Sequence, residues 1–131
     1  MTVRERKAEL RRRAARLPQA EAGALFDRFL ALPEVEAAEK YRIAAICAAP
    51  TLLARAGLLR KGARCVCYPG MEGELSAAGA VPQMERPTVV DGNLVTGRGP
   101  GAAFDFGLTL VEVLAGADAA RTVAAGLVYG V

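Results

Sequence analysis

The spacing of apolar positions changes near residue 40 of this chain of 131 residues. Before that point, Thr2 and Glu5 have the spacing of a capping box, which predicts a helix ending near Leu17. Pro18 suits the first turn of a second helix. The apolar residues of this second helix fall on one stripe, namely Leu25, Phe26, Phe29 and Leu30. We therefore expect residues 1–39 to form a helical hairpin.

After residue 40 the pattern is that of strands alternating with helices. The run Ile43–Ile46 is short and apolar, as in parallel strands that are covered on both faces. A helix is expected from Pro50 to about Leu59, a second strand over residues 63–68 and a weak helix over residues 71–78. This alternation predicts an α/β domain over residues 40–131.

The second half of this domain begins with a hairpin signal. Thr88–Val90 and Leu94–Thr96 are rich in strand formers, and they flank the turn residues Asp91, Gly92 and Asn93. Helices over residues 102–114 and 117–125 are expected to follow, and the last residues look extended.

The composition favours one packed domain. Apolar residues make up 53% of the chain and aromatic residues only 5%, so we expect an aliphatic core. No segment approaches the roughly 18 to 20 apolar residues that span a bilayer, and the charged N-terminus does not resemble a secretory signal. The three cysteines do not have the spacing of a disulfide framework. We therefore expect a cytoplasmic protein with reduced thiols and no membrane partner.

Charge and the absence of histidine narrow the chemistry further. The net charge is +3, and lysine and arginine crowd into residues 4–16. A basic helix can meet phosphate or nucleic acid, but a solvated face is its commoner role, so nucleic acid is not the expected partner. The chain has no histidine, which excludes a Cys-His dyad and a Ser-His-Asp triad and removes the commonest metal ligand. We expect neither a metal nor a cofactor.

Cys47 carries the main chemical signal. It lies where the expected strand meets the expected helix, and alanines flank it on both sides. A residue at such a junction adopts a tight, strained conformation that needs small neighbours, and the positive end of the following helix dipole favours a thiolate. A buried structural cysteine would show the same local sequence. From the residues alone, both interpretations stay open.

Three further features are better explained by structure than by chemistry. Cys65 and Cys67 would point to the same face of a strand, and two thiols without histidine make a poor zinc site, so packing is expected. Gly97–Gly101 lacks the Walker lysine and the Rossmann spacing, and it serves better as a close turn. Asp105 and Glu112 are expected to be solvated on one helix face.

From about residue 41 onward, the chain resembles the DJ-1/PfpI family of the class I glutamine-amidotransferase-like superfamily. Four motifs in order carry the resemblance: Ala44–Pro50, Cys67–Gly70, Asp91–Gly101 and Phe104–Phe106. The resemblance implies a flavodoxin-like α/β sandwich that is usually homodimeric. It also implies a nucleophilic or redox-sensing cysteine at the strand-to-helix elbow.

The resemblance assigns roles to particular residues. Cys47 takes the nucleophile position, and Ala48 would offer a backbone N–H to an oxyanion. Tyr68 occupies a position near the cysteine where many relatives have histidine. Arg98 and Pro100 belong to the loop beneath the site.

This chain also departs from the family pattern. Relatives carry a glutamate that bonds the catalytic sulfur and a Gly-Gly turn that completes the oxyanion hole, and both precede the elbow. Neither is found here, so we expect a partial sandwich, truncated at its N-terminal side. Exposed sheet faces and edges would then favour a homo-oligomer.

Residues 1–39 resemble a different family, the 5-formyltetrahydrofolate cyclo-ligases. The resemblance rests on residues 7–11, Leu17-Pro18 and residues 30–35. It implies that Lys7, and with it Arg11, would contact phosphate. The later cyclo-ligase segments are absent, so ring closure driven by ATP is not expected.

The resemblance to the DJ-1/PfpI family implies cysteine-dependent chemistry of the glyoxalase or deglycase type on small reactive aldehydes. The missing glutamate removes the acid–base group, so turnover should be impaired. The alternatives are a non-enzymatic module that senses oxidation or acts as a chaperone, and an inactive chimera.

Overall fold

The computed structural model describes residues 42–130. Residues Arg42–Val131 form a compact unit of their own. The expected helical hairpin of residues 1–39, with Lys7 and Arg11, lies outside the described residues.

The centre of this unit is a three-stranded sheet in the order β1-β5-β4. Strand β1 (Ile43–Ile46) runs parallel to β5 (Leu94–Gly97), so that Ile46 lies opposite Gly97. Strand β4 (Thr88–Asp91) pairs with β5 in antiparallel fashion, as the predicted hairpin requires. Gly92 has a φ of 60°, a conformation that a two-residue hairpin turn demands and that glycine adopts without strain. The parallel strand at 43–46 and the hairpin are both confirmed.

A second, two-stranded parallel sheet consists of β2 (Arg64–Cys65) and β3 (Val81–Pro82). The sequence predicted a longer strand over residues 63–68 and no strand at β3. The pairing with β3 ends at Cys65, and the chain then runs on to the central sheet and to Cys47. The N–H of Val66 donates to the Thr96 hydroxyl at 3.0 Å, and that of Tyr68 donates to the Cys47 carbonyl at 2.8 Å.

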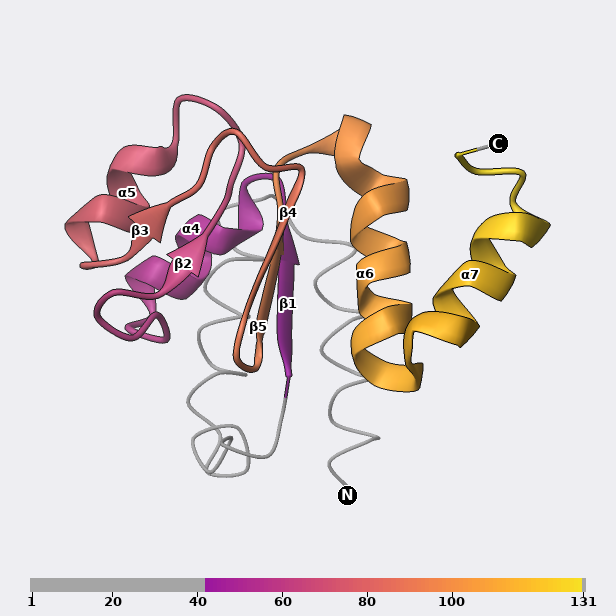
Figure 1. The fold of residues 1–131 in the computed structure, drawn as a ribbon. Coiled ribbons are helices and arrows are strands. Elements are labelled where there is room, and N and C mark those ends of the chain that lie inside the picture. The colour runs from indigo at the N-terminus through magenta and orange to yellow at the C-terminus, as the bar shows by residue number, and fades with distance from the viewer. Residues whose placement is uncertain (1–41, 131) are drawn as a thin grey trace, which may run out of the picture. The chain divides into compact units, whose positions relative to one another are not determined.

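Helices cover the central strands on both sides (Figure 1). Helix α6 (Ala103–Ala115) contacts β4 and β5, and a short 3₁₀ turn, η2 (Pro100–Ala102), leads into it. On the other side, α4 (Ala49–Arg55) contacts β1 and α5 (Glu72–Ala77). Helix α7 (Ala117–Gly126) follows α6 and contacts it. Apart from α4, these helices lie where the sequence predicted them.

Two predicted boundaries were wrong. The helix expected to reach Leu59 ends at Arg55, because Gly57 takes a φ of 70° and the N–H of Leu58 returns to the carbonyl of Leu53. The C-terminal residues are not extended. They form a turn in which Val128 has a φ of 55° and the N–H of Tyr129 returns to Ala124. This turn brings the Tyr129 ring onto Phe104, with 5.8 Å between the ring centroids.

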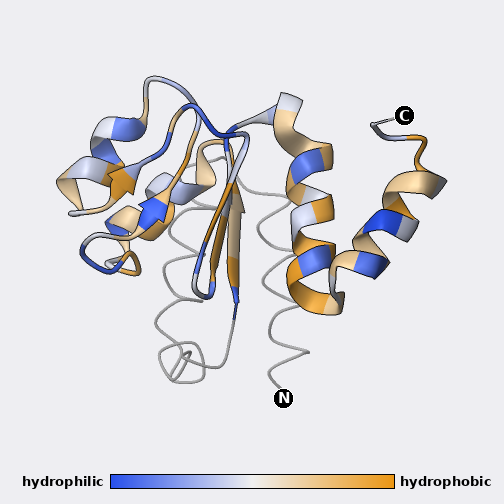
Figure 2. Ribbon diagram, viewed as in Figure 1, coloured by the Kyte–Doolittle hydropathy of each residue, from blue (hydrophilic) through white to orange (hydrophobic). Residues whose placement is uncertain are grey.

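The buried core is aliphatic, as expected. Among the described residues, the largest side chains with almost no exposure are Leu53, Leu75, Val66 and Val95, joined by Thr96, Pro50, Cys65 and Cys67. Apolar residues run along most of the central strands in Figure 2. The packing role predicted for Cys65 and Cys67 is confirmed, since both are fully buried.

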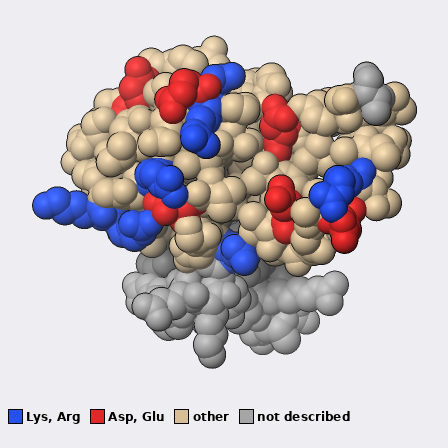
Figure 3. Space-filling model, viewed as in Figure 1, with Lys and Arg blue, Asp and Glu red and all other residues tan. Residues whose placement is uncertain are grey.

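Asp91 joins the hairpin to the second sheet. Its carboxylate accepts the N–H of Arg64 at 2.7 Å and pairs with the Arg60 guanidinium at 2.6 Å. Its side chain is largely buried, whereas the two arginines are mostly exposed. On the face seen in Figure 3, acidic and basic side chains lie close to one another. Such contacts tie the turn of the hairpin to the start of β2.

The two buried thiols should make the fold sensitive to alkali. Burial, aided by the charge of Asp91, raises the pKa of Cys65 from 9.0 to about 11. Burial, with Glu72 next in weight, raises the pKa of Cys67 to about 11 as well. The folded thiols keep their protons where unfolded thiols lose them, so stability is fully present below pH 9 and falls as the pH approaches 11.

Denaturant titrations of the wild type and of Cys65→Ala between pH 8 and 11 measure this effect. Each thiol should contribute a loss of up to about 1.4 kcal/mol per pH unit in this window. The variant should therefore lose stability less steeply than the wild type. Parallel pH profiles for the two proteins would contradict the assignment.

Gly97 should tolerate no side chain. A Cβ there would lie 2.8 Å from Cγ1 of Ile46 and 2.9 Å from Cδ2 of Phe106. Gly97→Ala should reduce the free energy of unfolding by about 1–3 kcal/mol, because side chains from β1 and α6 must move. Gly107→Ala is the matched control, since its Cβ would meet nothing within 4 Å and helix interiors favour alanine over glycine by roughly 0.5–1 kcal/mol. Equal effects of the two substitutions in urea unfolding would refute this packing.

Candidate functional site

Cys47 sits between β1 and α4 in a left-handed backbone conformation, with a φ of 65°. For residues other than glycine this conformation is uncommon and costs about 1–2 kcal/mol. The strained junction that the sequence predicted is therefore confirmed. The thiol is half-buried, unlike those of Cys65 and Cys67.

Two backbone hydrogen bonds hold Cys47 in place. Its N–H donates to the carbonyl of Gly97 at the end of β5 at 2.9 Å, and its carbonyl accepts the N–H of Tyr68 at 2.8 Å. Such bonds contribute about 0.5–1.5 kcal/mol each, which is enough to offset the strain. The elbow is thus fixed by residues that lie 21 and 50 positions further along the sequence, Tyr68 and Gly97.

The start of α4 is anchored just after the cysteine. The carbonyl of Ala48 accepts both the N–H of Thr51 at 3.1 Å and its hydroxyl at 2.6 Å. Thr51 is only 2% exposed, and Pro50 lies in the first turn, where its missing N–H costs nothing. The side chains that follow the thiol, Ala48 and Ala49, are therefore small, and the backbone at the start of α4 is fixed.

Tyr68 and the loop after β5 lie next to the elbow. The Tyr68 side chain is 48% exposed, and a Cβ on Gly99 would lie 3.5 Å from its ring. The N–H of Arg98 donates to the Pro87 carbonyl at 2.9 Å, and its guanidinium donates to the Met84 carbonyl at 3.2 Å. The structure thus brings Cys47, Ala48 and Tyr68 together, with the Arg98 loop beside Tyr68.

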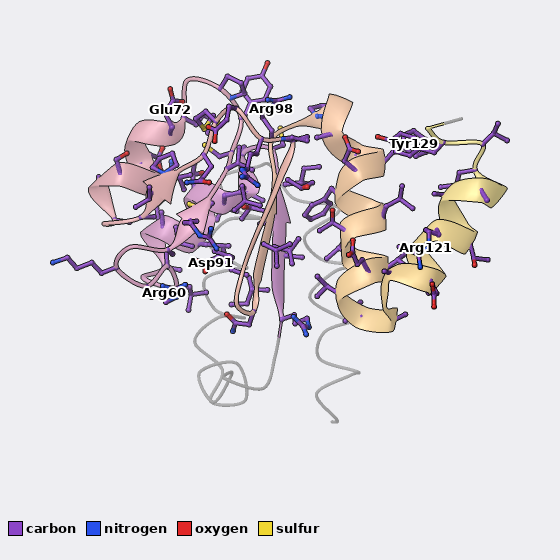
Figure 4. All side chains as sticks on the ribbon, viewed as in Figure 1. Arg60, Glu72, Asp91, Arg98, Arg121 and Tyr129 are labelled. Carbon is purple, nitrogen blue, oxygen red and sulfur yellow. The ribbon has the colours of Figure 1, made fainter. Side chains whose placement is uncertain are left out.

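Glu72 is a residue that the sequence analysis did not single out. Its carboxylate accepts the N–H of Gly70 at 2.6 Å, and its charge acts on the thiol of Cys67. Figure 4 shows Glu72 and Arg98 at the end of the domain toward which β1 points, whereas Arg60 and Asp91 lie closer to the end at which β1 begins. The signal was present, because Glu72 lies only two residues after the Tyr68–Gly70 turn.

Residues 42–130 contain no group of three or more Cys, Asp or Glu side chains that could hold a metal ion. Within the same range, no helix has the length and apolar character needed to cross a bilayer. The roles of Cys47, Ala48 and Tyr68, and the expected homo-oligomer, stay predictions.

A family model described as "DJ-1/PfpI family" matches residues 27–113. The match starts inside the segment that the sequence analysis assigned to a cyclo-ligase-like N-terminus. No comparison supports the cyclo-ligase resemblance.

Curated relatives agree with the family model. The chain is 46% identical over 86 residues to Protein dj-1beta of Drosophila melanogaster, covering 65% of this chain and 44% of that protein. It is 42% identical over 86 residues to the Parkinson disease protein 7 homolog of Danio rerio, covering 66% and 45%. It is 38% identical over 94 residues to an isonitrile hydratase of Pseudomonas putida, covering 72% and 40%. The chain thus spans less than half the length of these relatives.

Solved structures show the same fold. The crystal structure of Drosophila melanogaster DJ-1beta aligns with a TM-score of 0.73 at 31% identity, over 93% of this chain and 70% of that one. An oxidized Toxoplasma gondii DJ-1 aligns with a TM-score of 0.66 at 32% identity, over 84% of this chain and 54% of that one. The fold is therefore the α/β, flavodoxin-like fold of DJ-1, and the chain belongs to the DJ-1/PfpI family.

Proposed function

We propose that this protein uses Cys47 as a nucleophile toward small reactive aldehydes such as methylglyoxal. The observation that carries the proposal is the strained, half-buried cysteine at a strand-to-helix elbow, fixed by hydrogen bonds on both sides. Strain of this kind persists where the surrounding structure enforces it, and it gathers at reactive sites.

The chemistry begins with attack of the Cys47 sulfur on the aldehyde carbon. A carbon–sulfur bond forms, the carbonyl π electrons move to oxygen, and protonation of that oxygen gives a hemithioacetal. The backbone N–H of Ala48 is the proposed donor to the developing oxyanion, since it directly follows the nucleophile. Tyr68, half-exposed beside the elbow, is proposed to contact the substrate.

The following proton transfers need an acid–base group. The chain has no histidine, so the choice falls on carboxylates. Among the described glutamates, Glu72 lies near enough to act on the Cys67 thiol, although its carboxylate already accepts the N–H of Gly70. General acid–base catalysis typically contributes about 10²–10⁴ in rate, so we expect slow turnover from a carboxylate that is already held by the N–H of Gly70.

Methylglyoxal consumption by the full chain tests the proposal. Wild type should consume the aldehyde, Cys47→Ser should fall to the background rate, and Cys65→Ala should retain the wild-type rate because its thiol is buried in the core. Circular dichroism of all three proteins checks that they are folded. Equal consumption by wild type and Cys47→Ser would rule out the catalytic role.

A second candidate function is the sensing of oxidation. It is supported by the half-buried thiol of Cys47 and by the similarity to a DJ-1 that was solved in an oxidized form. A thiol in this position would pass through a sulfenic acid, which can be reduced again. This function needs a sulfur that a small oxidant can reach, but it needs no acid–base group.

A further inference from the structure

The segment that follows β2 brings a second cysteine to the elbow. On the other side of the elbow, Gly97, which lies opposite Ile46 at the end of β5, accepts the N–H of Cys47 at 2.9 Å.

One hydrogen bond links the elbow directly to the segment that carries Cys67. The carbonyl of Cys47 accepts the N–H of Tyr68 at 2.8 Å, so Cys67 immediately precedes the residue that is bonded to Cys47. The lengths of the peptide bonds and of this hydrogen bond place the Cα atoms of Cys47 and Cys67 roughly 5–7 Å apart. This range overlaps the roughly 4.4–6.8 Å between Cα atoms that a disulfide spans.

The sulfurs of Cys47 and Cys67 differ in how deeply they are buried. The Cys47 thiol is half-buried and can meet a small solute, whereas Cys67 is fully buried. The Cys67 thiol makes a hydrogen bond of 3.4 Å to the carbonyl of Tyr68, next to the bond that joins the two segments. Burial first, and then Glu72 and other charges including that of Cys47, raise the pKa of Cys67. A small oxidant can therefore reach the half-buried thiol of Cys47, whereas the thiol of Cys67 is buried and stays protonated at neutral pH.

We propose that Cys47 and Cys67 form an intramolecular disulfide when the protein meets a hydroperoxide. This inference rests on the second candidate function, because it requires that Cys47 is oxidised first. It adds a resolving partner, which would hold the oxidised site at a reversible stage.

The reaction has two steps. The Cys47 thiolate attacks one peroxide oxygen, the O–O bond breaks, and hydroxide or alkoxide leaves, giving a sulfenic acid at Cys47. The Cys67 sulfur then attacks the Cys47 sulfur, the S–O bond breaks, and water leaves with the proton from Cys67. In total two thiols lose two electrons and two protons, and the hydroperoxide gains them. A thiol reductant restores both cysteines.

Cys65 is the matched comparison. It lies two residues before Cys67 and is equally buried, but its register partner is Pro82. A cross-link that merely reflected three nearby thiols would include Cys65. The hydrogen bond between Tyr68 and Cys47 assigns the disulfide to Cys67 alone.

The test is a peptide map of the full chain after dilute hydrogen peroxide, with free thiols blocked and no reductant present. Trypsin separates Cys47 from the other two cysteines at Arg55, Arg60, Lys61 and Arg64. We expect the Cys47 peptide joined to the peptide that begins at Cys65. In Cys65→Ala the same joined pair should appear, because Cys67 remains.

In Cys67→Ala the cross-link should be lost, and Cys47 should proceed to sulfinic acid that reductant does not reverse. Cys67→Val, which fills a similar volume, repeats the test if the alanine variant does not fold. The wild-type and Cys65→Ala maps decide the question without either variant. Sulfinic acid at Cys47 in wild type with no cross-link would overturn the disulfide and leave the oxidation-sensing function standing. A cross-link to Cys65 would also overturn it, and an unoxidised Cys47 would overturn both proposals.

Discussion

The hydrogen bond from the Cys47 N–H to the Gly97 carbonyl is the contact on which the site depends. It extends the parallel pairing of β1 and β5 by one step beyond β1, at the point where the chain turns into α4. The approach of the two strands requires glycine at position 97, because Ile46 and Phe106 fill the space that a Cβ would take. With the second bond from Tyr68, this contact imposes a left-handed conformation that cysteine would otherwise avoid. Packing between β1, β5 and α6 therefore sets the geometry of the thiol.

Much of the fold followed from local sequence. The apolar run at 43–46, the Asp91–Asn93 turn and the helix after Gly101 were predicted because period, turn chemistry and glycine placement agree at each of them. The misplaced boundaries have identifiable causes. The helix after Cys47 ends at Arg55, shortly before Gly57 with its left-handed conformation, and the segment after β2 bonds to Thr96 and Cys47 where a longer strand was expected. Contacts between residues that far apart in sequence leave no local pattern.

The candidate site was predicted only in part, because it also depends on contacts between residues that lie far apart in the sequence. The alanines near Cys47 indicated the elbow. Nothing in the local sequence indicated that Cys67 lies near Cys47, or that Glu72 lies near Cys67. The cyclo-ligase resemblance finds no support in the comparisons, and short amphipathic basic helices recur in many proteins. The DJ-1/PfpI match instead begins at residue 27 and runs through the elbow to residue 113. Without histidine in the chain, backbone geometry and nearby thiols shape the behaviour of Cys47.

Amide hydrogen exchange at Cys47 and Tyr68 tests the central claim most directly. If both N–H groups are held as the structure has them, they should exchange only when the whole domain unfolds, with protection equal to the global free energy of unfolding. Fast exchange at either amide, while the amides within β5 stay protected, would show that the elbow opens by itself. That result would contradict the account of a cysteine fixed between β5 and the segment after β2.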